Sequence, residues 1–371
     1  MLDFIPDFPR TILAFLVVLG VLVFIHELGH YLAARWRGVH VDAFAIGFGR
    51  AITSWTDRRG TEWRLAWIPL GGYVKLHGQA DLGELSAEDR AKLRPGQTFH
   101  DKPVRDRAIV VVAGPVANFL LAILLFAGLF AFHGQPVGQT AIGAVAPGSA
   151  AERAGLLAGD EIISLDGNRV TRFDQLQRYI QPRAGQEVAV ALTREGREMV
   201  LRATPGIRPG SEAAPLGVLG VQGSAVRFEP MDPVSALAAG AAQTLDVSSQ
   251  TMVGIWEMLT GQRSARDLGG PIKIAEVSGE AASLGIVPLV NLMALLSVSL
   301  GLLNLFPVPL LDGGHLLFYA IEAIRGRPLP ARAQEYGFRA GFALLIGLFV
   351  FATWNDIAHG ALGRWVAGLV S

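Results

Sequence analysis

The residues best suited to chemistry are His26, Glu27 and His30, which form the sequence HELGH inside an apolar stretch, 11–34. On an α-helix, residues four apart face the same way, so the two imidazoles could hold one zinc ion. Glu27 stands beside them and could take a proton from a zinc-bound water. The pattern predicts a metal-dependent hydrolytic site.

The position of this motif within an apolar stretch strengthens the prediction. A charged group at the centre of a bilayer costs about 2.5–3.5 kcal/mol on insertion scales, so ionisable residues inside spans are functional as a rule. At a rise of about 1.5 Å per residue, the motif lies roughly 22–28 Å below Thr11, inside the membrane and nearer its cytoplasmic face. The alternative is a buried His/Glu hydrogen-bond cluster without a metal.

A third ligand is needed, because catalytic zinc usually has three protein ligands and an open position. The candidate is Asp312, which follows Pro307 and Pro309 in the sequence NLFPVPLLDGG and arrives at a depth comparable to that of His30. The prolines and glycines break the helix, and irregular backbone at depth is tolerated only where protein or water surrounds it. A plain helix-ending loop is the alternative, and His315 is a rival ligand. The predicted cofactor is one Zn²⁺ per chain, although His/His/Asp sites also accept other divalent ions.

The composition limits the class of protein that can carry this site. Hydrophobic residues make up 51% of the 371 residues and charged residues only 17%, against about 25% charged in soluble proteins. These values favour an integral membrane protein. Lys+Arg and Asp+Glu are equal at 32 each, so there is no basic footprint for nucleic acid. Cysteine is absent, which excludes disulfides, thiolate zinc sites and Cys nucleophiles.

Four apolar stretches are candidates for membrane spans, because about 20 apolar residues cross a bilayer as a helix. Lys and Arg residues flank the stretches unevenly, and the positive-inside rule then puts the first and third connections in the cytoplasm and the long central segment outside. The sequence predicts a polytopic α-helical membrane protein with about four transmembrane helices, drawn from the stretches 11–34, 108–132, 281–311 and 340–355.

The first connection, 41–77, is rich in glycine, tryptophan and β-branched residues and predicts a small membrane-associated β-meander. Its segment Gly72, Tyr73 and Val74 could form a strand edge that holds a locally unwound substrate by strand addition. A simple structural hairpin is the alternative.

The central segment alternates short apolar runs with turn signals and one helix, 173–180, and predicts a soluble α+β module. After it, 232–259 suggests an amphipathic helix along the membrane face, with Asp232 as N-cap and Pro233 at its first position. A helix packed on the spans is the alternative.

The predicted division is a first transmembrane helix with HExxH (1–36), a β-meander and loop (37–106), a second transmembrane helix (107–133), the module (134–224), an amphipathic extracytoplasmic segment (225–284), a third transmembrane helix with its NxxPxxxxDG loop (285–322) and a fourth (336–358).

Three motifs in this order resemble the site-2 protease family of intramembrane zinc metalloproteases: HELGH in a first span, AGPVANF at 113–119, and NLFPVPLLDG before a fourth span. The resemblance covers nearly the whole chain and is nearest to the bacterial regulator-of-sigma-E protease branch. It implies His26, His30 and Asp312 as zinc ligands and Glu27 as general base. It further implies that Asn304 contacts the substrate backbone, that Pro307 shapes the substrate site, and that 72–75 presents substrate.

The central module resembles a bacterial PDZ domain, through the sequence at 142–170 and through LGVLG at 216–220. The resemblance implies a peptide-carboxylate loop at Leu216, Gly217 and Val218, which would bind peptide C-termini. In the protease branch such domains act as size filters. The branch often carries two of them, and this chain has room for one.

These observations lead to an expected function, regulated proteolysis within the membrane. The substrates expected from the resemblance are single-span membrane proteins such as trimmed anti-sigma factors, and also remnant signal peptides. The expected location is the bacterial inner membrane, with the PDZ-like module on the periplasmic side. The alternatives are a non-catalytic PDZ-bearing scaffold and a transporter, which lacks the expected inverted repeats.

Overall fold

The structure is a computed structural model that describes residues 7–78, 96–138, 140–207, 216–224, 226–262, 264 and 269–359. Contacts divide the chain into two compact units. The first, the membrane unit, comprises Met1–Phe126, Ala239–Ile255 and Ser264–Ser371; the second, the sheet unit, comprises Ala127–Ala238 and Trp256–Arg263.

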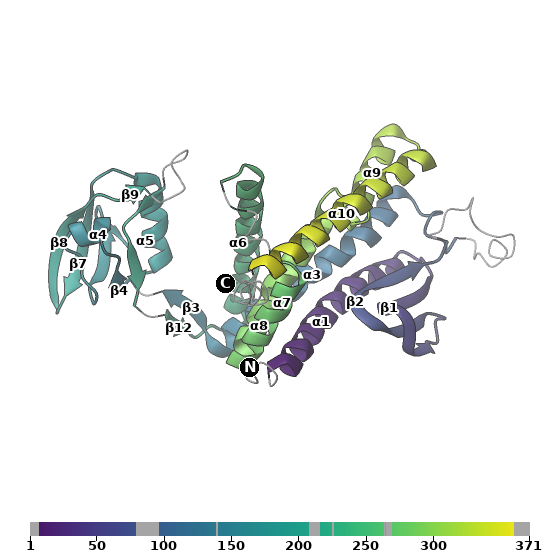
Figure 1. Ribbon diagram of the computed structural model, residues 1–371, viewed down its shortest axis with the longest axis horizontal. Helices are drawn as coiled ribbons and strands as arrows, with labels where there is room; N and C mark the ends of the chain where they lie inside the picture. The colour runs from purple at the N-terminus through teal and green to yellow at the C-terminus, as the bar shows by residue number, and fades with distance from the viewer. Residues whose placement is uncertain are drawn as a thin grey trace, which may run out of the picture. The chain divides into compact units, whose positions relative to one another are not determined.

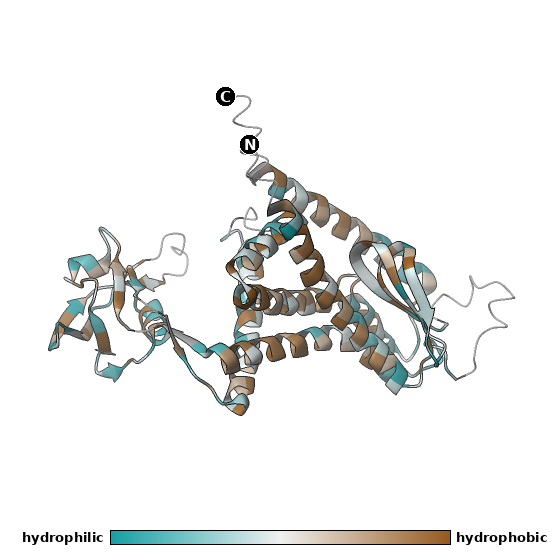
Figure 2. Ribbon diagram, turned by 90° about the horizontal axis from the view of Figure 1, so that it is seen from below, coloured by the Kyte–Doolittle hydropathy of each residue, from teal (hydrophilic) through white to brown (hydrophobic). Residues whose placement is uncertain are grey.

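Within the described residues, four helices are long and apolar enough to cross a membrane, as the sequence predicts. In Figure 2, which is coloured by hydropathy, hydrophobic residues make up much of the long helices. The fourth is longer than predicted, because its helix continues toward the N-terminus beyond the apolar core at 340–355. The helices are α1 (Asp7–Trp36), α3 (Val104–His133), α8 (Ile286–Leu305) and α10 (Ala331–His359).

The predicted break in the third apolar stretch is confirmed. Helix α8 ends at Leu305, and a new helix, α9 (Asp312–Arg325), begins at Asp312. The turn between them folds tightly onto α9, since a β-carbon at Gly313 would lie 2.2 Å from the carbonyl oxygen of Phe306. A glycine is therefore required immediately after Asp312.

Close helix contacts position the first span. A β-carbon at Gly29 of α1 would lie 2.3 Å from the carbonyl oxygen of Ala113 of α3. Nearer its start, α1 packs on α7 (Pro271–Leu284), where Gly279 faces Thr11. Small residues let these backbones approach closely, as is common between membrane helices.

The described residues of 225–284, the segment predicted as one amphipathic stretch, form three elements. They are β12 (Val226–Glu229), α6 (Pro233–Leu259) and α7. The predicted cap of α6 is confirmed: the Asp232 carboxylate accepts hydrogen bonds from the backbone N–H groups of Val234 and Ser235, with Pro233 in the first turn.

The first connection forms two long strands, β1 (Val41–Thr56) and β2 (Glu62–Leu76), which lie beside α1 (Figure 1). Both strands bend, so 43–46 of β1 has partners in 62–65 and in 72–75 of β2, while 53–56 also pairs with 62–65. Within the described chain, 72–75 therefore lies at an edge of this small sheet. Gly71 stands at the bend with a φ of 104°, as a glycine there can.

The sheet unit is built around one apolar core that includes Ile142, Leu165 and Leu192. Its main sheet has the order β6-β5-β7-β8, and helix α5 (Phe173–Ile180) has the predicted bounds. Besides β12, which pairs with β3, the unit contains β3 (Gln135–Gly138), β4 (Ile142–Val145), α4 (Ala150–Arg153), β5 (Glu161–Leu165), β6 (Asn168–Arg169), η1 (Gln181–Arg183), β7 (Val188–Arg194), β8 (Arg197–Ala203), β9 (Gly206–Ile207), β10 (Gly217–Val218) and β11 (Val221–Gly223).

Candidate metal centre

His26 and His30 project from one face of α1, as their spacing predicts. Their ring centroids are 4.8 Å apart, and the two Nε2 atoms face each other at 3.2 Å. His26 is only 8% exposed. The Nδ1 atom of His30 lies 2.9 Å from the backbone oxygen of Val110 on α3, and that bond requires the ring proton on Nδ1. Nε2 of His30 therefore keeps a free lone pair.

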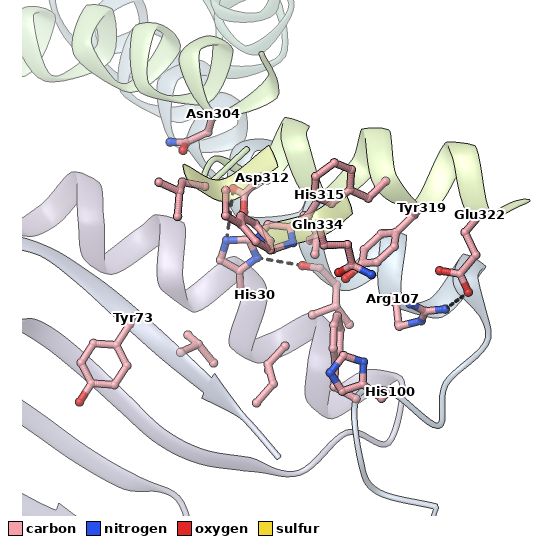
Figure 3. A pocket seen from close by; sticks show the side chains of 18 of the residues that line it. His30, Tyr73, His100, Arg107, Asn304, Asp312, His315, Tyr319, Glu322 and Gln334 are labelled. Atoms are coloured by element: carbon pink, nitrogen blue, oxygen red, sulfur yellow. Dashed lines mark hydrogen bonds and ion pairs between the residues drawn. The ribbon is translucent and has the colours of Figure 1, made fainter. Parts of the chain in front are cut away.

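Asp312 completes the cluster from a distant part of the chain. Its Oδ2 atom lies 3.1 Å from Nε2 of His26 and 3.4 Å from Nε2 of His30 (Figure 3). It stands at the first position of α9, so the break after α8 is what turns its carboxylate toward α1. Among the described residues, these three form the one group of His, Asp and Glu side chains whose ligand atoms converge in this way.

The three atoms have the chemistry and the spacing for zinc. Ligands bonded to a tetrahedral zinc at about 2.0–2.1 Å lie about 3.3 Å from one another, which matches the observed separations. Two imidazole nitrogens and a carboxylate oxygen are also the donor types that zinc prefers. Space beside them is provided by Gly114 of α3, where a β-carbon would lie 2.3 Å from Nε2 of His30.

Glu27 lines the same cavity as these three residues. The cavity has a volume of about 920 Å³. Gly72 of β2 packs directly on α1 here, and its β-carbon would lie 3.1 Å from Cγ of Glu27. The edge segment of β2 is thus beside both Glu27 and the group of three candidate metal ligands. Of the residues predicted to contact substrate, Gly72, Tyr73, Val74 and Asn304 line the cavity.

Two other sequence predictions fall elsewhere. Pro307 is not among the residues that line the cavity and stands in the turn between α8 and α9. The predicted peptide loop lies in the sheet unit, where Gly217 and Val218 form β10 and pair with β9. Gly217 packs against the end of α5, with its β-carbon position 2.3 Å from the oxygen of Ile180.

The sequence did not single out Arg107, Glu322 or Asn118, and it offered His315 as a possible metal ligand. His315, the rival ligand, lies in the cavity wall against Phe338 and not in the metal cluster. Arg107 and Glu322 form an ion pair at 2.6 Å in the cavity wall, although they are 215 residues apart in the sequence. Asn118 lies behind His26. A polar residue in the AGPVANF segment of an apolar span was the one available signal for Asn118.

Five histidines lie outside the predicted spans, and their positions in the sequence predict ordinary surface or loop residues; this prediction is wrong for two of them. His40 and His77 are buried, and Nδ1 of His77 lies 2.8 Å from Asp42 Oδ1. His100 lies in the wall of the cavity (Figure 3). His40 and His77 lie where the start of β1, the end of β2 and the segment 97–99 meet through backbone hydrogen bonds, a contact that sequence spacing does not reveal. Of the other two, His133 ends α3, and His359 ends α10.

Fold and site together define a multi-pass membrane protein with a candidate His/His/Asp metal centre and an acid beside it. The sequence profile of peptidase family M50 matches residues 14–348. The chain belongs to this family, the site-2 proteases, and is a zinc metalloprotease.

Relatives of similar length support this assignment. A protein of Rhizobium meliloti named as a zinc metalloprotease is 44% identical over 94% of this chain and 96% of its own length. The metalloprotease MmpA of Caulobacter vibrioides is 38% identical over 96% of this chain and 98% of its own. Among solved structures, a solution structure from Geobacillus thermodenitrificans covers 23% of this chain and 94% of its own, with 28% identity and a TM-score of 0.19, and carries no weight in the assignment.

Proposed function

We propose that this zinc metalloprotease is an endopeptidase that cleaves single-span membrane proteins within the bilayer. The observation that carries the proposal is the convergence of His26, His30 and Asp312, from a helix long enough to span a membrane and from the break after another, at one point of a cavity. A peptidase that acted on soluble chains would have no need to place its polar centre on such helices, where burial of charge is costly.

Different residues of the site bind the metal and transfer the proton. His26, His30 and Asp312 hold the metal, and zinc bound there supplies Lewis acidity that polarises a peptide carbonyl and makes water nucleophilic near neutral pH. Glu27 takes up the proton that the attacking water loses and delivers it to the departing amide nitrogen. The buried surroundings of the site exclude bulk water from the reacting groups.

Substrate must be extended before it can be cut, because a helical peptide bond is shielded by its own hydrogen bonds. The edge segment 72–75 of β2 supports a mode of presentation in which the substrate adds as a strand beside Glu27. Asn304 lines the same cavity, which supports a contact between its side chain and the substrate backbone. Pro307 acts indirectly, by ending α8 and shaping the turn.

The sheet unit serves as a PDZ-like module on the extracytoplasmic side of a bacterial inner membrane. The Lys and Arg residues that flank the spans support this orientation, because basic residues favour the cytoplasmic side of a membrane. The module filters substrates by the size of their outer domains, and the segment at Leu216, Gly217 and Val218 is its peptide-carboxylate loop. Substrates are therefore anti-sigma factors already trimmed outside the membrane, and remnant signal peptides form a second class.

The test uses purified full-length protein in detergent with a single-span model substrate. We expect about one zinc per chain, and cleavage inside the apolar segment of the substrate, mapped by mass spectrometry. Glu27→Gln should retain zinc and lose activity by about 10²–10⁴-fold, since a general base contributes that much. Wild-type cleavage by Glu27→Gln would refute the role of Glu27. Cuts confined to soluble loops would refute proteolysis within the membrane.

A further inference from the structure

Asn118 of α3 is fully buried and contacts His26, one of the three candidate metal ligands. Its side-chain nitrogen lies 3.1 Å from Nδ1 of His26, the ring nitrogen that points away from Asp312. Its Oδ1 atom is buried and has no hydrogen-bond partner within the described chain. Its backbone oxygen accepts a hydrogen bond from the Ser297 hydroxyl of α8 at 2.7 Å, which ties this part of α3 to the next span.

The contact between the two side chains has a chemical consequence. A neutral imidazole carries one proton, so a histidine that gives the lone pair of Nε2 to a metal carries its proton on Nδ1. An N–H at Nδ1 needs an acceptor, and an amide NH₂ group is a donor. The two ends of an amide have the same shape, so the pocket accepts the amide in either orientation. Only the orientation with Oδ1 toward His26 is compatible with a metal on Nε2.

The other histidine shows the same arrangement with a different partner. Nδ1 of His30 lies 2.9 Å from the backbone oxygen of Val110, which can only accept. Each metal-facing imidazole thus has a group of α3 behind its second nitrogen. For His30 that group is main chain, while for His26 it is a side chain that a substitution can change.

We propose that Asn118 is a positioning residue for the metal centre. Its amide oxygen accepts the Nδ1–H of His26, which fixes the ring orientation and the tautomer that leaves Nε2 free for zinc. This inference rests on the proposed metal-binding role of His26, His30 and Asp312. Partners of this kind behind a metal ligand typically change metal affinity by about 10–100-fold.

Two substitutions of similar size separate this role from a packing role. Asn118→Asp keeps an acceptor at the position, whereas Asn118→Leu fills the space and removes the acceptor. We expect Asn118→Leu to weaken zinc binding about 10–100-fold, measured by competition with a chelator on the full-length protein in detergent. Asn118→Asp should bind zinc at least as tightly as the unaltered protein. A packing role predicts the reverse order, because a buried carboxylate is costly and a leucine is not.

A control substitution tests for general weakening of the helix bundle. Ser299→Ala removes a hydroxyl that, among the described residues, donates to the oxygen of Leu295 within α8, and should leave zinc affinity unchanged. If the unaltered protein binds no zinc through His26, His30 and Asp312, the proposed function fails. If it binds zinc and Asn118→Leu binds equally well, only the role of Asn118 fails.

A measurement on the unaltered protein does not depend on how the variants fold. In ¹⁵N-histidine NMR of the zinc-free protein, where no metal dictates the tautomer, we expect the Nδ1 of His26 to carry the proton. An unprotonated Nδ1 at His26 would overturn the proposal.

Discussion

Gly114 of α3 and His30 of α1 approach so closely that a β-carbon at position 114 would lie 2.3 Å from Nε2 of His30. The same atom would lie 2.9 Å from Nε2 of His26. Separations below 3.0 Å cannot be accommodated without movement of one group. The space beside the two ligand nitrogens therefore exists because position 114 has no side chain.

Gly114→Ala should abolish zinc binding, because its methyl group occupies the space beside the histidine nitrogens. We expect a loss of affinity of at least about 100-fold, the upper end of effects from groups next to ligands. The measurement is chelator competition. Gly128→Ala on the same helix meets nothing within 4 Å and should bind zinc normally. Equal affinity in the two variants would contradict the geometry of the site.

Gly341→Ala should disturb the turn that carries Asp312. A β-carbon at Gly341 of α10 would lie 2.1 Å from the backbone oxygen of Pro309. The turn must move to make room, and such overpacking costs about 1–3 kcal/mol. We expect a lower unfolding midpoint in detergent and weaker zinc binding. Gly347→Ala, which meets nothing within 4 Å on the same helix, is the control and should match the unaltered protein.

Glu322→Gln should destabilise the part of the cavity wall where Arg107 and Glu322 meet. Arg107 and Glu322 are only 11% and 13% exposed, so the substitution leaves a largely buried guanidinium without its counter-charge. Breaking one partner of such a pair costs about 3–5 kcal/mol. Denaturant titration of the purified protein measures the effect. Glu335→Gln breaks an exposed helical pair with Arg339 and should cost only about 0.3–0.5 kcal/mol. Similar losses of unfolding free energy in both variants would show that the buried ion pair contributes no more to stability than the exposed one.

The sheet unit should lose stability in acid through Asp160. Hydrogen bonds from Arg194 hold the pKa of this buried carboxyl below its usual value. A lowered pKa in the folded state adds stability above the unfolded value of about 3.9, and that stability is lost as pH falls through the folded value. Asp160→Asn should therefore destabilise the unit by about 1–3 kcal/mol at neutral pH and by less below about pH 4.

Hydrogen exchange of β5 and β7 in the full-length protein, corrected for intrinsic rates, measures this difference at each pH. Glu187→Gln, in an exposed pair with Arg202, should have little effect at any pH. A penalty for Asp160→Asn that is the same at pH 3 and pH 7 would show that the carboxylate charge is not the cause.

The sequence by itself determined the features that depend on local spacing. The four-residue separation of His26 and His30 placed both imidazoles on one helix face, and Pro307 and Pro309 ended α8 before Asp312. The cap of α6 at Asp232 was also predicted, since it depends on the two residues that follow. These features follow from helix periodicity and backbone restriction, which neighbours in sequence decide.

Only the tertiary structure decided which distant groups meet. His26 and Asn118 are 92 residues apart in the chain, and Arg107 and Glu322 are 215 apart. Their contacts depend on how closely α1, α3 and α9 approach one another, and glycines at Gly29 and Gly114 set that approach. The burial of His40 and His77 likewise depends on the contact of two strand ends with the segment 97–99. Helix packing and strand register are properties of the whole fold, so spacing along the chain does not reveal them.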